Sequence, residues 1–229
     1  MKHCSIIMFV LFNSIYCYAQ FKFRATSISA KDIDFVADTA NDSTRKFVLE
    51  NERLLDSTYD LSKDYDFEFR LSQSGLGNNA RSVFIMILRK DIWSARYFHF
   101  NKYWIGNRKD LVEVKVDSSK LNQLWYLLNR QNVLTLPSEN EIIKCKTKEY
   151  LIDTFDFSNY GSVERNMIVA DGIGYKFELS TPKKRRSYYY SNPEINFKEY
   201  PYIKEYSDAV LILYLIRKYL GLPITLPFG

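Results

Sequence analysis

The stretch KKRRSYYY, residues 183–190, combines four consecutive cations with a hydroxyl and three phenols. Guanidinium and ammonium groups bind carboxylates and phosphates, and a tyrosine offers an apolar ring with a polar tip. The candidate binding residues are these four cations, Lys183, Lys184, Arg185 and Arg186. Two interpretations remain open. One is an anion-binding finger for an acidic protein, an acidic polysaccharide or a lipopolysaccharide phosphate. The other is a solvated turn whose long side chains cover apolar neighbours.

The residues on either side of the cations predict a β-hairpin. In YKFELS, residues 175–180, apolar and polar side chains alternate as they do along a strand. Pro182 cannot adopt the positive φ that the first central position of a two-residue primed turn demands, so a four-residue loop over 181–184 is expected. That loop sets Phe177 opposite Tyr188 on the buried face. The tyrosines are then mainly structural, and the cations at the tip remain available for binding.

Side chains for histidine- or cysteine-dependent catalysis are scarce. Beyond residue 19 the chain has one histidine, His99, and one cysteine, Cys145. His99 alternates with phenylalanines in YFHFN as a strand residue does, and a free cysteine is most often buried. A Ser-His-Asp triad or a zinc site with several histidines would need more of these residues. We interpret both as structural, and we expect no metal ion or other cofactor.

Carboxylates are the remaining catalytic groups, because glycoside hydrolysis needs two of them and no histidine. The candidates are Asp153, Asp156, Glu164, Asp171 and Glu178. Positions on a solvated surface explain the same residues without catalysis. The alternative function is therefore a secreted, glycosidase-like hydrolase that uses neither a metal nor a nucleotide cofactor.

The stretch GLGNNA, residues 75–80, matches the G-x-G-x-x-A form of a dinucleotide-binding fingerprint. That motif needs a helix immediately after it, so that the pyrophosphate meets the helix N-terminus. Residues 82–88 predict a strand instead, so we interpret GLGNNA as a turn.

The N-terminus has the layout of a secretory signal peptide. Lys2 precedes an apolar run from Ile6 to Leu11, and Cys17 and Ala19 are the small residues before a cleavage site. The run is shorter than the roughly 20 apolar residues of a spanning helix, so no transmembrane segment is expected after cleavage. Bulky Tyr16 before the cysteine disfavours attachment of a lipid. A periplasmic or secreted location is expected.

Cleavage would divide the chain into a leader, residues 1–19, and a single α+β domain, residues 20–229. The formal net charge of +5 falls by one when Lys2 is lost. This mild excess is far below that of a typical nucleic-acid-binding domain, and DNA is not a partner that an exported protein meets.

The elements that position these residues follow from their periodicity. Four strands are expected over 65–72, 82–90, 93–101 and 111–117, as a meander. The segment 82–90 is apolar on both faces and predicts a strand covered from both sides, whereas 65–72 predicts a half-buried strand. Further strands are expected over 167–180 and 185–190.

Two helices are expected to cover this sheet. Leu121, Leu124, Trp125 and Leu128 form the stripe of an amphipathic middle helix capped by Asp117 or Ser118. A C-terminal helix with Ser207 as its N-cap ends at Gly221, and it is apolar all round from Ala209 to Ile216. A short helix is also expected over 44–55.

Together these elements predict an α+β fold. It consists of a mostly antiparallel sheet, made of a meander plus a later hairpin, with an amphipathic middle helix and a buried C-terminal helix. The function expected from the sequence is an exported, non-catalytic binding module of the cell envelope or the extracellular space.

Overall fold

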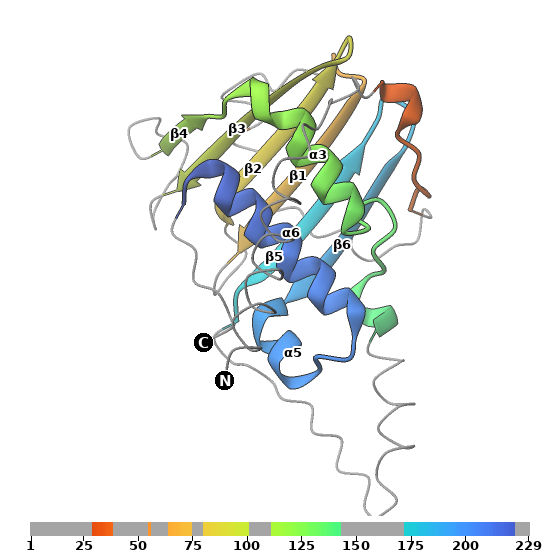
Figure 1. Ribbon diagram of the computed structural model, residues 1–229, viewed down its shortest axis with the longest axis vertical. Coiled ribbons are helices and arrows are strands. Elements are labelled where there is room, and N and C mark those ends of the chain that lie inside the picture. The colour runs from red at the N-terminus through yellow and green to blue at the C-terminus, as the bar shows by residue number, and fades with distance from the viewer. Residues whose placement is uncertain are drawn as a thin grey trace, which may run out of the picture.

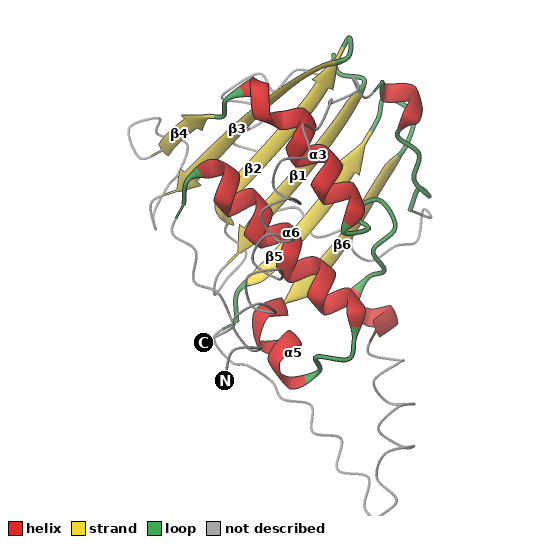
Figure 2. Cartoon of the chain, viewed as in Figure 1, coloured by secondary structure: helices red, strands yellow, loops and turns green. Residues whose placement is uncertain are grey.

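The computed structural model describes residues 29–38, 55, 64–74, 80–100, 111–142 and 172–222. The predicted leader, Cys145 and most of the predicted 44–55 helix lie outside the described residues, although Leu55 is helical and buried. Helices cover one face of an antiparallel sheet (Figures 1 and 2), which confirms the predicted α+β class.

The sheet contains six strands in the order β4-β3-β2-β1-β5-β6, and every neighbouring pair is antiparallel. The strands are β1 Phe67–Ser74, β2 Ala80–Arg89, β3 Ile92–Phe100, β4 Leu111–Lys115, β5 Gly174–Ser180 and β6 Arg185–Ser191. The first four strands form the predicted meander, and β5 and β6 form the predicted hairpin. The hairpin joins beside β1, so β6 is an edge strand of the sheet.

The meander contains one turn that the sequence did not predict. Lys90 and Asp91 connect β2 to β3 with φ values of 48° and 61°. Positive φ at both central residues is the two-residue hairpin geometry that Asn and Gly usually provide. A hydrogen bond of 2.6 Å from the Lys90 amide to Asp66 Oδ2 holds this turn against the start of β1.

The middle helix α3, Leu121–Arg130, follows the predicted stripe. Its four apolar residues, Leu121, Leu124, Trp125 and Leu128, are all buried. Asp117 accepts a hydrogen bond of 2.9 Å from the Ser119 amide at the start of the short helix η4, Ser118–Lys120, which leads into α3. The predicted apolar face is therefore confirmed, whereas Asp117 caps η4 and α3 itself begins after Lys120 without a side-chain cap bond.

The C-terminal helix α6, Lys204–Leu220, begins three residues before the predicted cap, so Ser207 lies inside the helix. Gly221 ends it with a φ of 66°, as predicted. Burial is less complete than the apolar run suggested, because Leu213 is buried whereas Leu211 and Leu215 are half-buried. The short helix α5, Pro193–Glu199, was not predicted.

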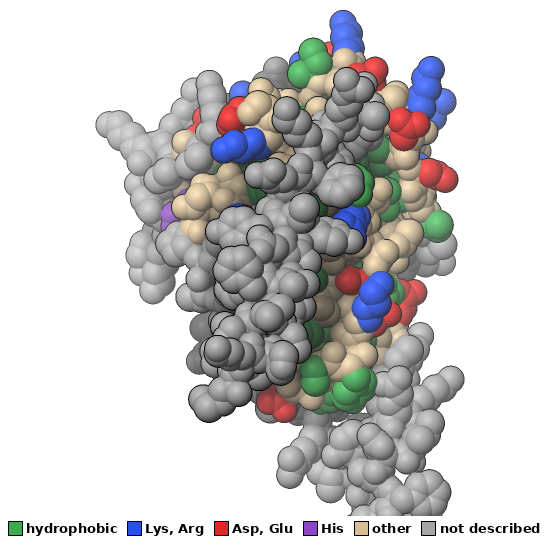
Figure 3. All heavy atoms as spheres, in the orientation of Figure 1, with side chains coloured by type: hydrophobic (Ala, Val, Ile, Leu, Met, Phe, Trp, Pro, Cys, Tyr) green, Lys and Arg blue, Asp and Glu red, His purple; other side chains and the backbone are tan. Residues whose placement is uncertain are grey.

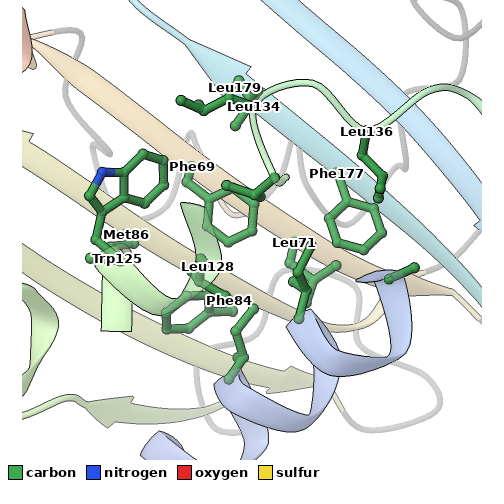
Figure 4. Close-up of a cluster of buried hydrophobic side chains, with 14 of the residues drawn as sticks. Phe69, Leu71, Phe84, Met86, Trp125, Leu128, Leu134, Leu136, Phe177 and Leu179 are labelled. Atoms are coloured by element: carbon green, nitrogen blue, oxygen red, sulfur yellow. The ribbon is translucent and has the colours of Figure 1, made fainter. Parts of the chain in front are cut away.

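The core lies between the sheet and the helices α3 and α6 (Figure 4). Three aromatic rings from different elements meet there. The ring of Trp125 on α3 lies 5.0 Å from that of Phe67 on β1 and 5.2 Å from that of Trp93 on β3. Because β1 and β2 lie in the middle of the sheet, their apolar residues reach the core directly beneath α3.

The opposite face of β1 and β5 is also buried, although the sequence predicted a half-buried β1. Glu68 and Arg70 on β1 are only 7% and 8% exposed, and Lys176 and Glu178 on β5 are 4% and 3% exposed. The register sets Arg70 opposite Glu178, so opposite charges neighbour one another both along and across the strands. This pairing allows charges to be buried, since an unpaired ion in the same place would be very costly.

Candidate functional site

The predicted hairpin is built as expected. The register pairs Ser180 with Arg185, Leu179 with Arg186, Phe177 with Tyr188, Lys176 with Tyr189 and Tyr175 with Tyr190. Residues 181–184 form the predicted four-residue loop. The Thr181 amide donates to the Lys184 carbonyl at 2.8 Å, and the Thr181 hydroxyl accepts from the amides of Lys183 and Lys184 at 3.3 and 3.1 Å. The loop that presents the cations is thus bonded internally.

The tyrosines that follow the cations are structural, as predicted. Tyr188 stacks on Phe177 with ring centroids 4.9 Å apart, and its hydroxyl donates to the Val133 carbonyl at 2.7 Å. The Tyr190 hydroxyl donates to the Pro137 carbonyl at 2.9 Å. Burial raises the pKa of both phenols, so they remain neutral donors. They fasten the segment that follows α3 onto β6.

Arg186 belongs to the same face of β6 as Tyr188 and extends this fastening. Its guanidinium donates to the carbonyls of Leu134 and Leu136 at 3.3 and 2.7 Å. Its Cζ atom lies 5.7 Å from the centre of the Tyr188 ring. Arg186 was expected at the tip, and the structure places two of its donors on backbone carbonyls of the segment after α3.

Arg185 points to the opposite face, where it forms an ion pair with Glu178. Glu178 also contacts Lys176, with the ammonium nitrogen 3.1 Å from its carboxylate. Burial alone would raise the pKa of Glu178, but the positive charges of Lys176, Arg185 and Arg70 outweigh it and hold that pKa below its usual value. Arg185 is half-exposed, and it links the tip of the hairpin to the buried charges of β1 and β5.

Lys184 is engaged by the segment that follows the short helix η1, Ala30–Asp32. Its ammonium contacts the carboxylate of Asp34, donates to the Phe35 carbonyl at 2.7 Å and lies 4.5 Å above the Phe35 ring. The hydrogen bond and the charge of Lys184 lower the pKa of Asp34. Lys184 is thus bound to a carboxylate within its own chain.

Residues 33–38, named here the N-terminal strap, run beside the outer edge of β6. The Asp38 amide donates to the Arg185 carbonyl at 2.9 Å. The Asp38 carboxylate accepts from the amide and the hydroxyl of Ser187 at 2.7 and 3.0 Å. Figure 1 shows η1 beside the β5–β6 turn, and Figure 3 shows charged side chains of both signs at that corner.

Sequence reasoning missed the role of the strap. The signal was present in DIDF, residues 32–35, where aspartates alternate with apolar residues as they do along a strand. Ile33 and Phe35 are buried, whereas the Asp34 side chain between them is 91% exposed. The two strap aspartates, Asp34 and Asp38, contact the cationic hairpin.

Lys183 is the cation of the four that stays available. Its side chain is exposed, and no hydrogen bond or ion pair joins it to any part of the chain that the structure describes. The structure thus places the four predicted binding residues in one hairpin but gives them different surroundings. Lys183 is exposed and has no partner among the described residues, Arg185 is half-exposed in an ion pair, Lys184 is bound by the strap, and Arg186 donates to backbone carbonyls.

Of the five candidate catalytic carboxylates, the structure describes Glu178. Asp153, Asp156, Glu164 and Asp171 lie outside the described residues. Glu178 is described, and its lowered pKa keeps it ionised, which is the opposite of what a general acid requires.

The fingerprint-like GLGNNA lies outside the described residues except for Ala80, which begins β2. A strand therefore follows the motif, as predicted, in place of the helix that a dinucleotide site needs. His99 is exposed on β3 between the buried Phe98 and Phe100, so the strand alternation is confirmed.

A small cavity lies under the C-terminal part of α6. Its volume is about 40 Å³, and Gln73, Ser82 and Arg217 are among the polar residues that line it. Typical ligand pockets measure about 300–1,000 Å³, whereas a buried water needs about 10–15 Å³. The cavity is therefore of a size for two or three water molecules.

Within the described ranges, no three metal-ligating side chains gather in a way that would hold an ion. None of the helices described combines the length and the apolar character needed to cross a membrane. The chain matches no protein-family model, no curated protein and no solved structure at a level that indicates relationship.

Proposed function

We propose that this protein is an exported, non-catalytic interaction module that binds an anionic partner through the β5–β6 turn. The observation that supports the proposal most is the combination of a rigid turn with an exposed cation at its tip. Lys183 has no partner in the described residues, while the loop beneath it is fixed by the hydrogen bonds of Thr181. A braced turn loses little conformational entropy on binding, which favours recognition.

The charges beside Lys183 favour an anionic partner over an apolar one. Arg185 is half-exposed, and Lys184 is about one-third exposed at 29%. Both cations can reach a ligand at the tip while they keep their contacts with Glu178 and Asp34. Three cations on neighbouring positions attract anions over a distance of about one Debye length, so binding should weaken as salt is added.

The experiment that tests this function is capture from an envelope extract on the immobilised full chain, at low and high salt. We expect a partner that is retained at low salt and released at high salt, and we expect Lys183→Ser to lose most of it. Lys198→Ser is the matched control, because Lys198 is an exposed lysine of α5 at the other end of the molecule. Equal retention by all three proteins would refute the role of the turn.

Export is the other part of the proposal, and it rests on the leader-like residues 1–19. Expression with the native N-terminus in a Gram-negative host should give a mature protein that begins near Gln20 or Phe21. Mass spectrometry of the folded protein checks this directly. A folded protein that keeps Met1 would contradict export.

A further inference from the structure

The strap occupies an edge that another peptide strand can also occupy. β6 is an edge strand of the sheet, so one row of its backbone groups faces outward, and such a row is a template for an added strand. The strap uses this row at two points. The Arg185 carbonyl accepts from the Asp38 amide at 2.9 Å, and the Ser187 amide donates to the Asp38 carboxylate at 2.7 Å.

The strap also brings negative charge to the hairpin cations. Asp34 pairs with Lys184, and Asp38 binds Ser187 at the neighbouring outward position of β6. Between these aspartates, Phe35 places its ring in the core at 6.1 Å from Phe67 and beneath the Lys184 ammonium. The strap is therefore an extended segment that brings two carboxylates and a buried apolar residue to this edge.

We propose that the outer edge of β6 from Lys184 to Ser187 binds an extended acidic peptide of a partner protein, and that the N-terminal strap occupies this edge when the partner is absent. This inference rests on the proposed anion-binding function of the turn and names the class of partner. Lys183, which the strap leaves without a contact, supplies the first attraction.

Backbone contacts favour a peptide over the other anions. The Arg185 carbonyl accepts a hydrogen bond from an amide of the strap, and a second peptide can donate in the same way. A lipid phosphate or a phosphorylated sugar satisfies Lys184, but its phosphate has no amide to offer the Arg185 carbonyl. An acidic peptide therefore reproduces all of the strap's contacts, whereas a phosphate reproduces those of the strap carboxylates but not the amide bond to the Arg185 carbonyl.

The exposed residues of the strap favour its displacement by a partner peptide. The Asp34 side chain is 91% exposed and Val36 is 74% exposed. Ion pairs at such exposed positions contribute little and are screened by salt. The strap is nevertheless a strong competitor, because a segment of the same chain acts at an effective concentration of about a millimolar. A partner peptide should therefore bind the intact chain weakly and bind tightly once the strap is weakened.

The test uses the full chain with Asp34→Asn and Asp38→Asn, which removes both carboxylates and keeps the apolar anchors Ile33 and Phe35. The probe is a fluorescent peptide with the sequence of residues 29–38, and the comparison peptide is the same sequence with asparagine in place of Asp34 and Asp38. The control chain carries Asp91→Asn and Glu199→Gln, which remove two exposed carboxylates that do not belong to the strap. Fluorescence anisotropy gives the affinities, and thermal unfolding verifies that each chain is folded.

We expect the acidic peptide to bind the strap variant at least about tenfold tighter than the wild type or the control chain, because the competitor in the same chain has been weakened. We expect the asparagine peptide to bind poorly to every chain, and Lys184→Gln in the strap variant to abolish the gain. Equal binding of the acidic peptide to the strap variant and to the control chain would overturn the inference.

Three further results would also overturn the inference. One is dimer formation by the strap variant in place of peptide binding, which would mean that the strap of one copy binds the β6 edge of another. Another is binding of phosphatidylglycerol vesicles without binding of the peptide. The third is Lys183-dependent retention of the extract partner together with no peptide binding, which would leave the proposed function intact. The absence of both activities would refute the proposed function itself.

Discussion

Replacing Glu178 by glutamine should strongly destabilise the protein, although the change removes no atom from the packing. Glu178 is 3% exposed and lies 3.1 Å from the ammonium of Lys176, which is 4% exposed. The substitution removes the carboxylate that lies 3.1 Å from this buried ammonium. Breaking a buried pair in this way costs about 3–5 kcal/mol of the free energy of unfolding.

Urea unfolding at neutral pH measures this cost by linear extrapolation. Glu199→Gln is the matched control at an exposed carboxylate, and it should change the free energy of unfolding by less than about 0.5 kcal/mol. Replacing both partners, with Lys176→Met and Glu178→Leu, should recover most of the loss, because apolar residues of similar volume replace a buried pair at little cost.

The pH dependence gives an independent check. The pKa of Glu178 in the folded protein lies below its value of 4.5 in the unfolded chain, so its ionisation stabilises the fold above pH 4.5. That stabilisation is lost as the pH falls through the folded-state pKa. The gap between wild type and Glu178→Gln should narrow over this acidic range. A cost below about 1 kcal/mol at neutral pH would refute the account of a buried charge network, since water would then solvate these groups.

Further changes test the core and the hairpin. Leu213→Ala should cost about 2–5 kcal/mol because Leu213 is buried on α6, and the half-buried Leu211→Ala should cost less; urea unfolding compares them. Tyr188→Phe should cost about 1–2 kcal/mol, because it removes the donor to the buried Val133 carbonyl, and the melting temperature reports the loss. Lys183→Ser should leave the melting temperature unchanged, and a large shift would show that this side chain has a structural role.

The hairpin register and the buried face of α3 could be predicted from the sequence, because local patterns of apolar residues determine them. The period-2 alternation and the position of Pro182 fixed the hairpin register down to individual pairs, such as Phe177 with Tyr188. The 3.6-residue stripe of α3 identified its buried face in the same way. In each case one face must meet a core, so a shift by one residue would bury the wrong side chains.

The surroundings of the candidate site could not be predicted from the sequence, because contacts between distant segments determine them. Lys184 contacts Asp34 although 149 residues separate them in the chain, and neither local sequence pattern predicts that contact. Arg186 was expected at a solvated tip, yet the carbonyls that bind it belong to the segment after α3. The pairing of β5 with β1, which sets Arg70 opposite Glu178, is likewise not specified by the chain order alone.

The most direct test of the proposed function is the affinity of the full chain for a fluorescent poly-glutamate probe, compared among wild type, Lys183→Ser and Lys198→Ser. The two substitutions remove the same charge, so a nonspecific attraction would fall equally in both. If the β5–β6 turn is the binding surface, Lys183→Ser weakens binding several-fold at low salt and Lys198→Ser leaves it unchanged. The difference between the two variants should vanish near 1 M salt, where the Debye length is about 3 Å. Equal weakening by the two substitutions, or no binding by the wild type, would contradict the account.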